Sequence, residues 1–169
     1  MQRLGRGGYT LMELITTILI IGVLAAFAVP NYIGTVETNK YDDAVGLTNQ
    51  IGMTNRMFAL DHAGSYSTGQ FMGANCACAA GTCAGYGAGP FPACALVCCN
   101  YLGDQPWSTK PYNFYACDPG TGGGGGGCAG GLVSASQRNG GIAPYSGWGV
   151  NMSNAGTMNG TGGAPSPTY

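Results

Sequence analysis

The stretch YTLMELITTILIIGVLAAFAV, residues 9–29, decides the fold of this 169-residue chain. It is apolar apart from three threonines, Gly22 and Glu13. As a helix, these residues span about 32 Å, enough to cross the hydrocarbon core of a bilayer. Arg3 and Arg6 precede the stretch, which places the N-terminus in the cytoplasm and the chain after Pro30 outside.

The basic, glycine-rich residues 1–8, MQRLGRGG, come before the apolar stretch. A secretory signal has its small-residue cleavage site after the apolar run, where cutting removes the run from the mature protein. Here Gly7 and Gly8 lie in front of it. Cleavage after Gly8 would leave the apolar segment in place as a retained anchor.

Glu13 is an acidic residue inside an apolar helix, where a charge costs a few kcal/mol and marks a functional candidate. Cleavage after Gly8 would create an α-amino group on Tyr9, one helical turn from Glu13. The two charges could pair within one subunit or between neighbouring subunits. The sequence leaves both pairings open.

Pro30 follows the apolar stretch and predicts a kink or break, because proline removes a backbone hydrogen bond and costs about 3 kcal/mol inside a helix. Gly22 is a second weak point. Apolar residues then recur at helical spacing from Ile33 to Phe58. We expect one helix from Tyr9 to about Leu60, with an apolar segment at 9–30 and an amphipathic half at 31–60.

Residues 61–169 are expected to form a globular head, and they contain 25 of the 32 glycines. Strands are predicted at 112–117, 132–136 and 142–150 from their aromatic and β-branched residues. The six-glycine run at 122–127 lacks the features of a phosphate-binding loop and is interpreted as a flexible loop. The predicted fold class is α+β, with the long N-terminal helix packed on a small antiparallel sheet.

The chain has eight cysteines, all of them in this head. An even number clustered in a glycine-rich domain behind a membrane-targeting segment predicts disulfides formed in an oxidising compartment. Their spacings do not match the paired C-x2-C of zinc or iron–sulfur sites. The connectivity stays open among 105 possibilities. The cysteines are Cys76, Cys78, Cys83, Cys94, Cys98, Cys99, Cys117 and Cys128.

Charged residues make up 8% of the chain, against about 25% in ordinary soluble domains. The net charge is −1 and no basic patch is visible, so we expect no nucleic-acid partner. His62 is the one histidine, and no nucleophile constellation or C-x2-C redox motif occurs. We therefore expect no enzyme activity and no cofactor or metal; a membrane-anchored redox protein using the cysteines is the weakest alternative.

Residues 7–32 resemble the N-terminal signature of type IV prepilins and of the pseudopilins of type II secretion systems. The match comprises Gly8 at the cleavage point, Tyr9 where the family usually has Phe, Glu13 as the fifth mature residue, and Pro30-Asn-Tyr. The resemblance implies that a prepilin peptidase cuts after Gly8 and methylates the new amine of Tyr9. It also implies that Glu13 pairs with the Tyr9 amine of an adjacent subunit and that the helix from Gly22 to Pro30 loosens in the filament.

The resemblance further implies a homopolymeric filament, lifted from the inner membrane by an ATPase-driven assembly platform and displayed outside the cell. Our first hypothesis is therefore the major subunit of a type IV pilus. The alternative is a minor pilin or a pseudopilin. Residues 102–115, with Trp107 and the run Lys110-Pro-Tyr, are similar to a pseudopilin stretch. In that case Asp104 and Asp118 are available carboxylates, although calcium prefers six to eight oxygen ligands.

Overall fold

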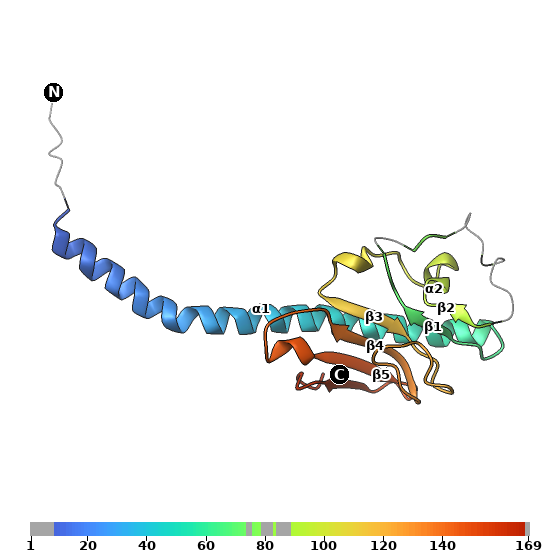
Figure 1. Ribbon diagram of the computed structural model, residues 1–169. Helices are drawn as coiled ribbons and strands as arrows, with labels where there is room; N and C mark the ends of the chain where they lie inside the picture. Colours follow the sequence, from blue (N-terminus) through green and yellow to red (C-terminus); the bar gives the residue numbers. More distant parts are fainter. Residues whose placement is uncertain (1–8, 74–75, 79–82, 84–88, 168–169) are drawn as a thin grey trace, which may run out of the picture. The chain divides into compact units, whose positions relative to one another are not determined.

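The computed structural model describes residues 9–73, 76–78, 83 and 89–167. The chain divides into two compact units, Met1–Asn39 and Lys40–Tyr169, and each is described by itself. The second unit contains a six-stranded sheet and the C-terminal part of the long helix (Figure 1).

The helix α1 runs from Leu11 to Asp61, close to the bounds that the sequence predicts. Pro30 lies inside it without ending it. Just after the helix, Gly64 has a φ of +85° and donates its backbone N–H to the carbonyl of Ala59 at 2.8 Å. Glycine is favoured there because a left-handed residue closes a helix and satisfies its last carbonyls.

The six strands form one sheet in the order β2-β1-β3-β4-β5-β6. All neighbouring pairs are antiparallel except β1 and β2, which run parallel, so the sheet is mixed. A short helix α2 follows β2, and turns of 3-10 helix, η2 and η3, precede β3 and β5. The bounds are β1 Ser67–Gln70, β2 Phe91–Pro92, α2 Ala95–Cys98, η2 Trp107–Thr109, β3 Tyr112–Ala116, β4 Leu132–Arg138, η3 Tyr145–Gly147, β5 Gly149–Ser153 and β6 Met158–Thr161.

Two of the three predicted strands correspond closely to β3 and β4. The prediction of a strand over 142–150 is wrong for most of its length, because β5 begins only at Gly149. Pro144, which has no backbone N–H to give to a sheet, precedes the 3-10 turn Tyr145–Gly147. Strands β1, β2 and β6 were not predicted, since they are short and poor in β-branched residues.

The core of the second unit lies between the C-terminal part of α1 and one face of the sheet. From the helix come Tyr41, Val45, Ile51 and Phe58, each at most 2% exposed. From β3 and β5 come Tyr112, Phe114 and Val150. Phe91, Leu96 and Trp107 come from β2, α2 and η2, and Phe71 and Leu102 come from the connecting segments.

Asn55 is a fully buried polar side chain on the inner face of α1. Its Nδ2 donates to the carbonyls of Ser67, Cys117 and Val133 at 3.0–3.1 Å, and its Oδ1 accepts the backbone N–H of Ser67 at 2.9 Å. Two turns earlier, the Thr48 carbonyl accepts the Ser134 hydroxyl at 2.7 Å. Because buried polar groups are costly unless they are hydrogen-bonded, these contacts fix the helix on the sheet.

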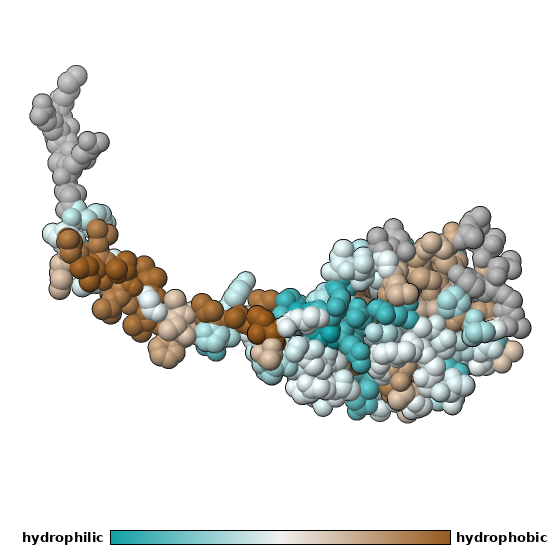
Figure 2. Space-filling view, in the orientation of Figure 1, coloured by the Kyte–Doolittle hydropathy of each residue, from teal (hydrophilic) through white to brown (hydrophobic). Residues whose placement is uncertain are grey.

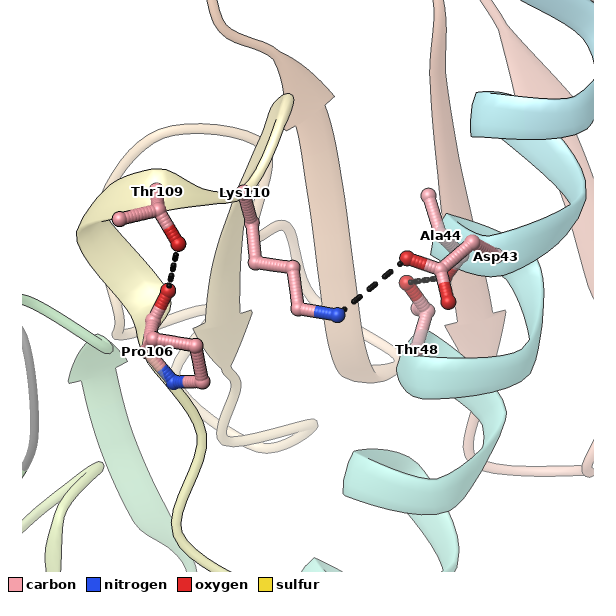
Figure 3. A network of polar contacts seen from close by, with 6 residues as sticks. All are labelled: Asp43, Ala44, Thr48, Pro106, Thr109 and Lys110. Atoms are coloured by element: carbon pink, nitrogen blue, oxygen red, sulfur yellow. Dashed lines mark hydrogen bonds and ion pairs between the residues drawn. The ribbon is translucent and has the colours of Figure 1, made fainter.

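At the surface, Lys110 contacts Asp43 of α1 at 3.4 Å (Figure 3). The two side chains are 21% and 54% exposed. An exposed ion pair of this kind contributes at most about 1 kcal/mol, because solvent screens the charges. Packing and buried hydrogen bonds, and not this ion pair, therefore provide most of the attachment between the sheet and the helix.

The eight cysteines form four disulfides. Three of them join residues 76–83 to residues 94–99, at and beside α2: Cys76–Cys94, Cys78–Cys98 and Cys83–Cys99. The fourth, Cys117–Cys128, closes the loop between β3 and β4.

The six-glycine run lies inside the loop closed by Cys117–Cys128 and packs against the sheet. A Cβ on Gly126 would lie 2.7 Å from the Tyr115 hydroxyl, and one on Gly124 would lie 2.5 Å from the carbonyl of Ala116. Tyr115, Cys117 and Ala135 form a small second cluster of buried residues there. The run is a loop, as predicted, and its close contacts at Gly124 and Gly126 leave no room for a side chain at these two positions.

Candidate functional site

The first unit carries an apolar surface that the chain itself leaves uncovered. The large apolar side chains from Tyr9 to Val29 are 46–81% exposed, and the face in view is mostly hydrophobic (Figure 2). Among the described residues, α1 is the one helix that is long and apolar enough to cross a membrane, judged by length and composition. Exposed apolar patches of this size mark a membrane or protein interface.

Glu13 lies in the first turn of α1 and is held by Thr10, the residue before the helix. The Glu13 carboxylate accepts the backbone N–H and the hydroxyl of Thr10, both at 2.8 Å. In return the Glu13 backbone N–H donates to the Thr10 hydroxyl at 3.3 Å. This is a capping box, which satisfies backbone N–H groups at the start of a helix.

The role of Thr10 was missed in the sequence analysis, although the signal is present. Thr10-Leu-Met-Glu13 is the T-x-x-E pattern that precedes an apolar run. In the uncleaved chain Tyr9 is joined to Gly8 and has no free amine, so the Glu13 carboxylate is bound by its own helix start. Cleavage between Gly8 and Tyr9 would give Tyr9 a free α-amino group. This amine would lie one residue before Thr10, whose backbone N–H binds the Glu13 carboxylate.

The other polar groups of this segment are satisfied within the helix. The hydroxyls of Thr16 and Thr17 donate to the carbonyls of Glu13 and Leu14, at 3.0 and 2.8 Å. Such bonds spare a hydroxyl the cost of being buried unpaired in an apolar environment. In the sequence, Glu13 is the one charged residue between Arg6 and Glu37.

The remaining residues singled out from the sequence fall in different places. Gly8, the expected cleavage point, lies outside the described residues. Gly22 has nothing within 4 Å of the position that a Cβ would occupy, so the first unit itself does not require glycine there. Next to Pro30, the Asn31 side chain donates to the carbonyl of Phe27 at 3.2 Å.

The two carboxylates considered for calcium are both engaged in hydrogen bonds within the head. Asp104 accepts the backbone N–H groups of Cys76 and Gln105 and the indole N–H of Trp107, at 3.0–3.3 Å. Asp118 accepts the N–H of Gly120 and the hydroxyl of Thr121. In the part of the chain that is described, no three His, Cys, Asp or Glu side chains gather as a metal would need.

Comparison with known proteins gives one informative similarity. The chain is 36% identical over 58 residues to the type II secretion system core protein G of Vibrio cholerae serotype O1, a match that covers 33% of this chain and 38% of that protein. The chain therefore matches well under half of that relative's length. No family model matches the chain. No solved structure matches it either.

The matched relative is named as a secretion-system component and not as an enzyme. The α+β fold, with a long N-terminal helix on a mixed sheet and four disulfides, is consistent with a pilin-like architecture. The apolar start of α1 is consistent with membrane anchoring. Together these findings support, loosely, a relationship between this chain and the pilins and pseudopilins.

Proposed function

We propose that this chain is the major structural subunit of a type IV pilus and polymerises through the first part of α1. The observation that carries the proposal is the uncovered apolar surface from Tyr9 to Val29, preceded by Gly8 and interrupted by the charge of Glu13. An apolar helix of this kind needs a bilayer before assembly and other helices after it. The disulfide-bonded, low-charge head suits display outside the cell.

The proposal includes a processing step and four segments. Residues 1–8 form a leader that a prepilin peptidase removes after Gly8, and the new N-terminal amine of Tyr9 is methylated. Residues 9–30 are the membrane and filament-core segment, 31–60 the amphipathic half of the helix, and 61–169 the head. In this scheme Glu13 pairs with the Tyr9 amine of an adjacent subunit, and Gly22 and Pro30 allow the helix to loosen during packing.

The proposed location follows from these segments. The subunit resides in the inner membrane until an assembly platform transfers it into an extracellular filament of identical copies. The low content of basic residues gives no reason to add nucleic acid to its partners.

A second candidate function is favoured by one observation. The 58-residue similarity to the core protein G of a type II secretion system supports a pseudopilin, and a low-copy minor pilin shares the same N-terminal features. These candidates differ from the first in copy number and in location, which makes them experimentally separable.

The first experiment is mass spectrometry on filaments sheared from the cell surface, compared with the membrane fraction. A major pilin is expected to dominate the filaments, to begin at a methylated Tyr9 and to carry four disulfides. If the filaments lack the chain while membranes retain it in processed form, the major-pilin proposal fails and the pseudopilin remains. Recovery of an uncleaved chain in membranes alone would contradict both.

A second experiment tests the assembly role of Glu13. Glu13→Gln keeps a hydrogen-bond acceptor for Thr10 but removes the charge, so membrane levels should stay unchanged while filament yield falls by about tenfold or more, as expected from the loss of a poorly solvated ion pair. Thr17→Val is the matched control, because its hydroxyl bonds only within the helix. Filaments at wild-type yield with Glu13→Gln would contradict the proposed pairing.

A further inference from the structure

A pocket of about 490 Å³ lies in the head. It is formed where the turn between α1 and β1 meets the residues before β2 and the loop after β3. Three glycines line it together with Ser65, Tyr66, Thr68, Pro90, Asp118 and Thr121. Its volume lies in the range of small-ligand sites, roughly 300–1,000 Å³.

We propose that this pocket binds a neutral saccharide. Among the described residues that line it, Asp118 is the one carboxylate, and there is no lysine, arginine or histidine. An anionic ligand such as a phosphate or a sulfated sugar would face this carboxylate without a compensating cation, which is unfavourable. The ligand class is therefore neutral or cationic.

The carboxylate of Asp118 is held as a rigid acceptor. Its Oδ1 accepts the Gly120 N–H and its Oδ2 accepts the Thr121 hydroxyl, both at 2.8 Å. An ionised carboxylate has about four lone-pair sites, so both oxygens keep capacity for further donors. Two neighbouring hydroxyls of a sugar ring could use this capacity at once, in hydrogen bonds strengthened by the carboxylate charge.

The rest of the wall offers the complementary features of a sugar ring. Tyr66 and Pro90 contribute ring side chains, which can cover the C–H face of a pyranose. The Tyr66 hydroxyl donates to Asn154 at 3.3 Å, so the ring is anchored at its far end. Ser65 and Thr68 supply hydroxyls that can both donate and accept.

The wall that carries Asp118 is also fixed before any ligand arrives. The loop after β3 is closed by the disulfide Cys117–Cys128, directly beside Asp118. The Asp118 backbone N–H donates to the Gly123 carbonyl at 3.1 Å, which closes the turn. Preformed walls lower the entropy cost of binding.

A cationic ligand fits less well, because the pocket presents a single carboxylate. Metal ions such as calcium require six to eight oxygens, and the described residues that line this pocket include no second acidic one. The lining contains more side chains with a hydroxyl or a ring than charged side chains. This composition favours a polyhydroxylated ring over an ammonium group.

The test is saturation-transfer difference NMR on the full chain in phosphocholine micelles, which lack sugar headgroups. The probes are glucose, galactose, mannose and N-acetylglucosamine, with lysine methyl ester and calcium chloride as competitors. We expect at least one sugar to bind with a Kd below about 10 mM. Asp118→Asn should weaken that binding about tenfold or more, because one acceptor oxygen is lost.

Three further variants make the result decisive. Tyr66→Leu should also abolish the signal, whereas Tyr66→Phe should keep it, because the ring remains. Asp43→Asn is the matched control, since Asp43 lies outside the pocket. The near-UV circular dichroism spectrum of each variant verifies the fold, and the two Tyr66 variants test the site independently if Asp118→Asn does not fold.

The proposal would be overturned if none of the four sugars bound, or if Asp118→Asn and Tyr66→Leu both bound sugar as tightly as the wild type. Binding of lysine methyl ester or calcium that depends on Asp118, without sugar binding, would assign the pocket to a cation instead.

Discussion

Replacing a glycine of α1 by alanine should have opposite effects at Gly52 and at Gly46. Gly52 is buried against the sheet, where an added Cβ would lie 2.7 Å from the Ser134 hydroxyl and even closer to the sulfur of Met152. Gly46 lies two turns earlier in the same helix, and nothing would lie within 4 Å of its added Cβ. The two substitutions share the same change in helix propensity, so they separate that effect from packing.

The expected magnitudes follow from these contacts. At Gly46 the substitution should stabilise the head by about 0.5–1 kcal/mol, the cost of glycine in a helix. At Gly52 the same gain is opposed by overpacking, which costs about 1–3 kcal/mol. Displacing Ser134 also weakens its 2.7 Å bond to the Thr48 carbonyl, worth about 1 kcal/mol. The net loss for Gly52→Ala is therefore about 1–4 kcal/mol.

Thermal unfolding of the full chain in detergent, with the disulfides intact, measures both changes. Near-UV circular dichroism of Trp107 and Trp148 follows the tertiary structure of the head. For a unit of this size, 1 kcal/mol shifts the Tm by roughly 3–5 °C. We expect a decrease of about 10 °C for Gly52→Ala and a small increase for Gly46→Ala. A Gly52→Ala variant at least as stable as the wild type would refute the close helix–sheet contact.

Three other predictions concern the head. Asn55→Ala should lower the free energy of unfolding by about 3 kcal/mol or more, because buried N–H and carbonyl groups lose their partner; a loss below 1 kcal/mol in denaturant titration would contradict this. Tyr101 donates a hydrogen bond to the Asp61 carboxylate, and this bond, together with burial and the nearby charge, raises the pKa of the Tyr101 phenol. Because the pKa is higher in the folded state, the stabilisation is fully present below the unfolded value near 10 and is lost as pH rises through the folded pKa. Tyrosinate absorbance should show one late-titrating phenol that Tyr101→Phe removes, and an unchanged titration curve would oppose the assignment. Replacing Cys117 and Cys128 together by serine should cost about 3 kcal/mol through the entropy of the opened loop, measured as a lower Tm, and no change would indicate that packing alone orders the glycine run.

The sequence predicts the parts of the fold that depend on local periodicity. Helix α1 follows from the spacing of its apolar residues, and strands β3 and β4 follow from their aromatic and β-branched residues. Neither signal needs knowledge of the rest of the chain. Strands β1 and β6, with sequences STGQ and MNGT, carry no such signal, because their place in the sheet comes from pairing with neighbours. Tertiary context overrides propensity in such short strands.

The polar contacts also divide into local ones, which the sequence can predict, and long-range ones, which it cannot. The capping box of Thr10 and Glu13 is local and could have been predicted from the four-residue pattern T-x-x-E. Asn55 could not, because its partners lie 12 to 78 residues away and an asparagine on a helix ordinarily faces water. The disulfide pairing likewise depends on how distant segments meet, which the cysteine spacing does not encode.

The three disulfides between residues 76–83 and 94–99 have a consequence for proteolysis. A protease that cuts the backbone once between Cys83 and Cys94 leaves Cys76, Cys78 and Cys83 before the cut, each of them bonded to a cysteine after it. The two pieces would separate only under reducing conditions, so a nicked molecule keeps its mass on a non-reducing gel. If the head is displayed outside the cell, as proposed, a single backbone cut in this segment would leave the molecule covalently intact.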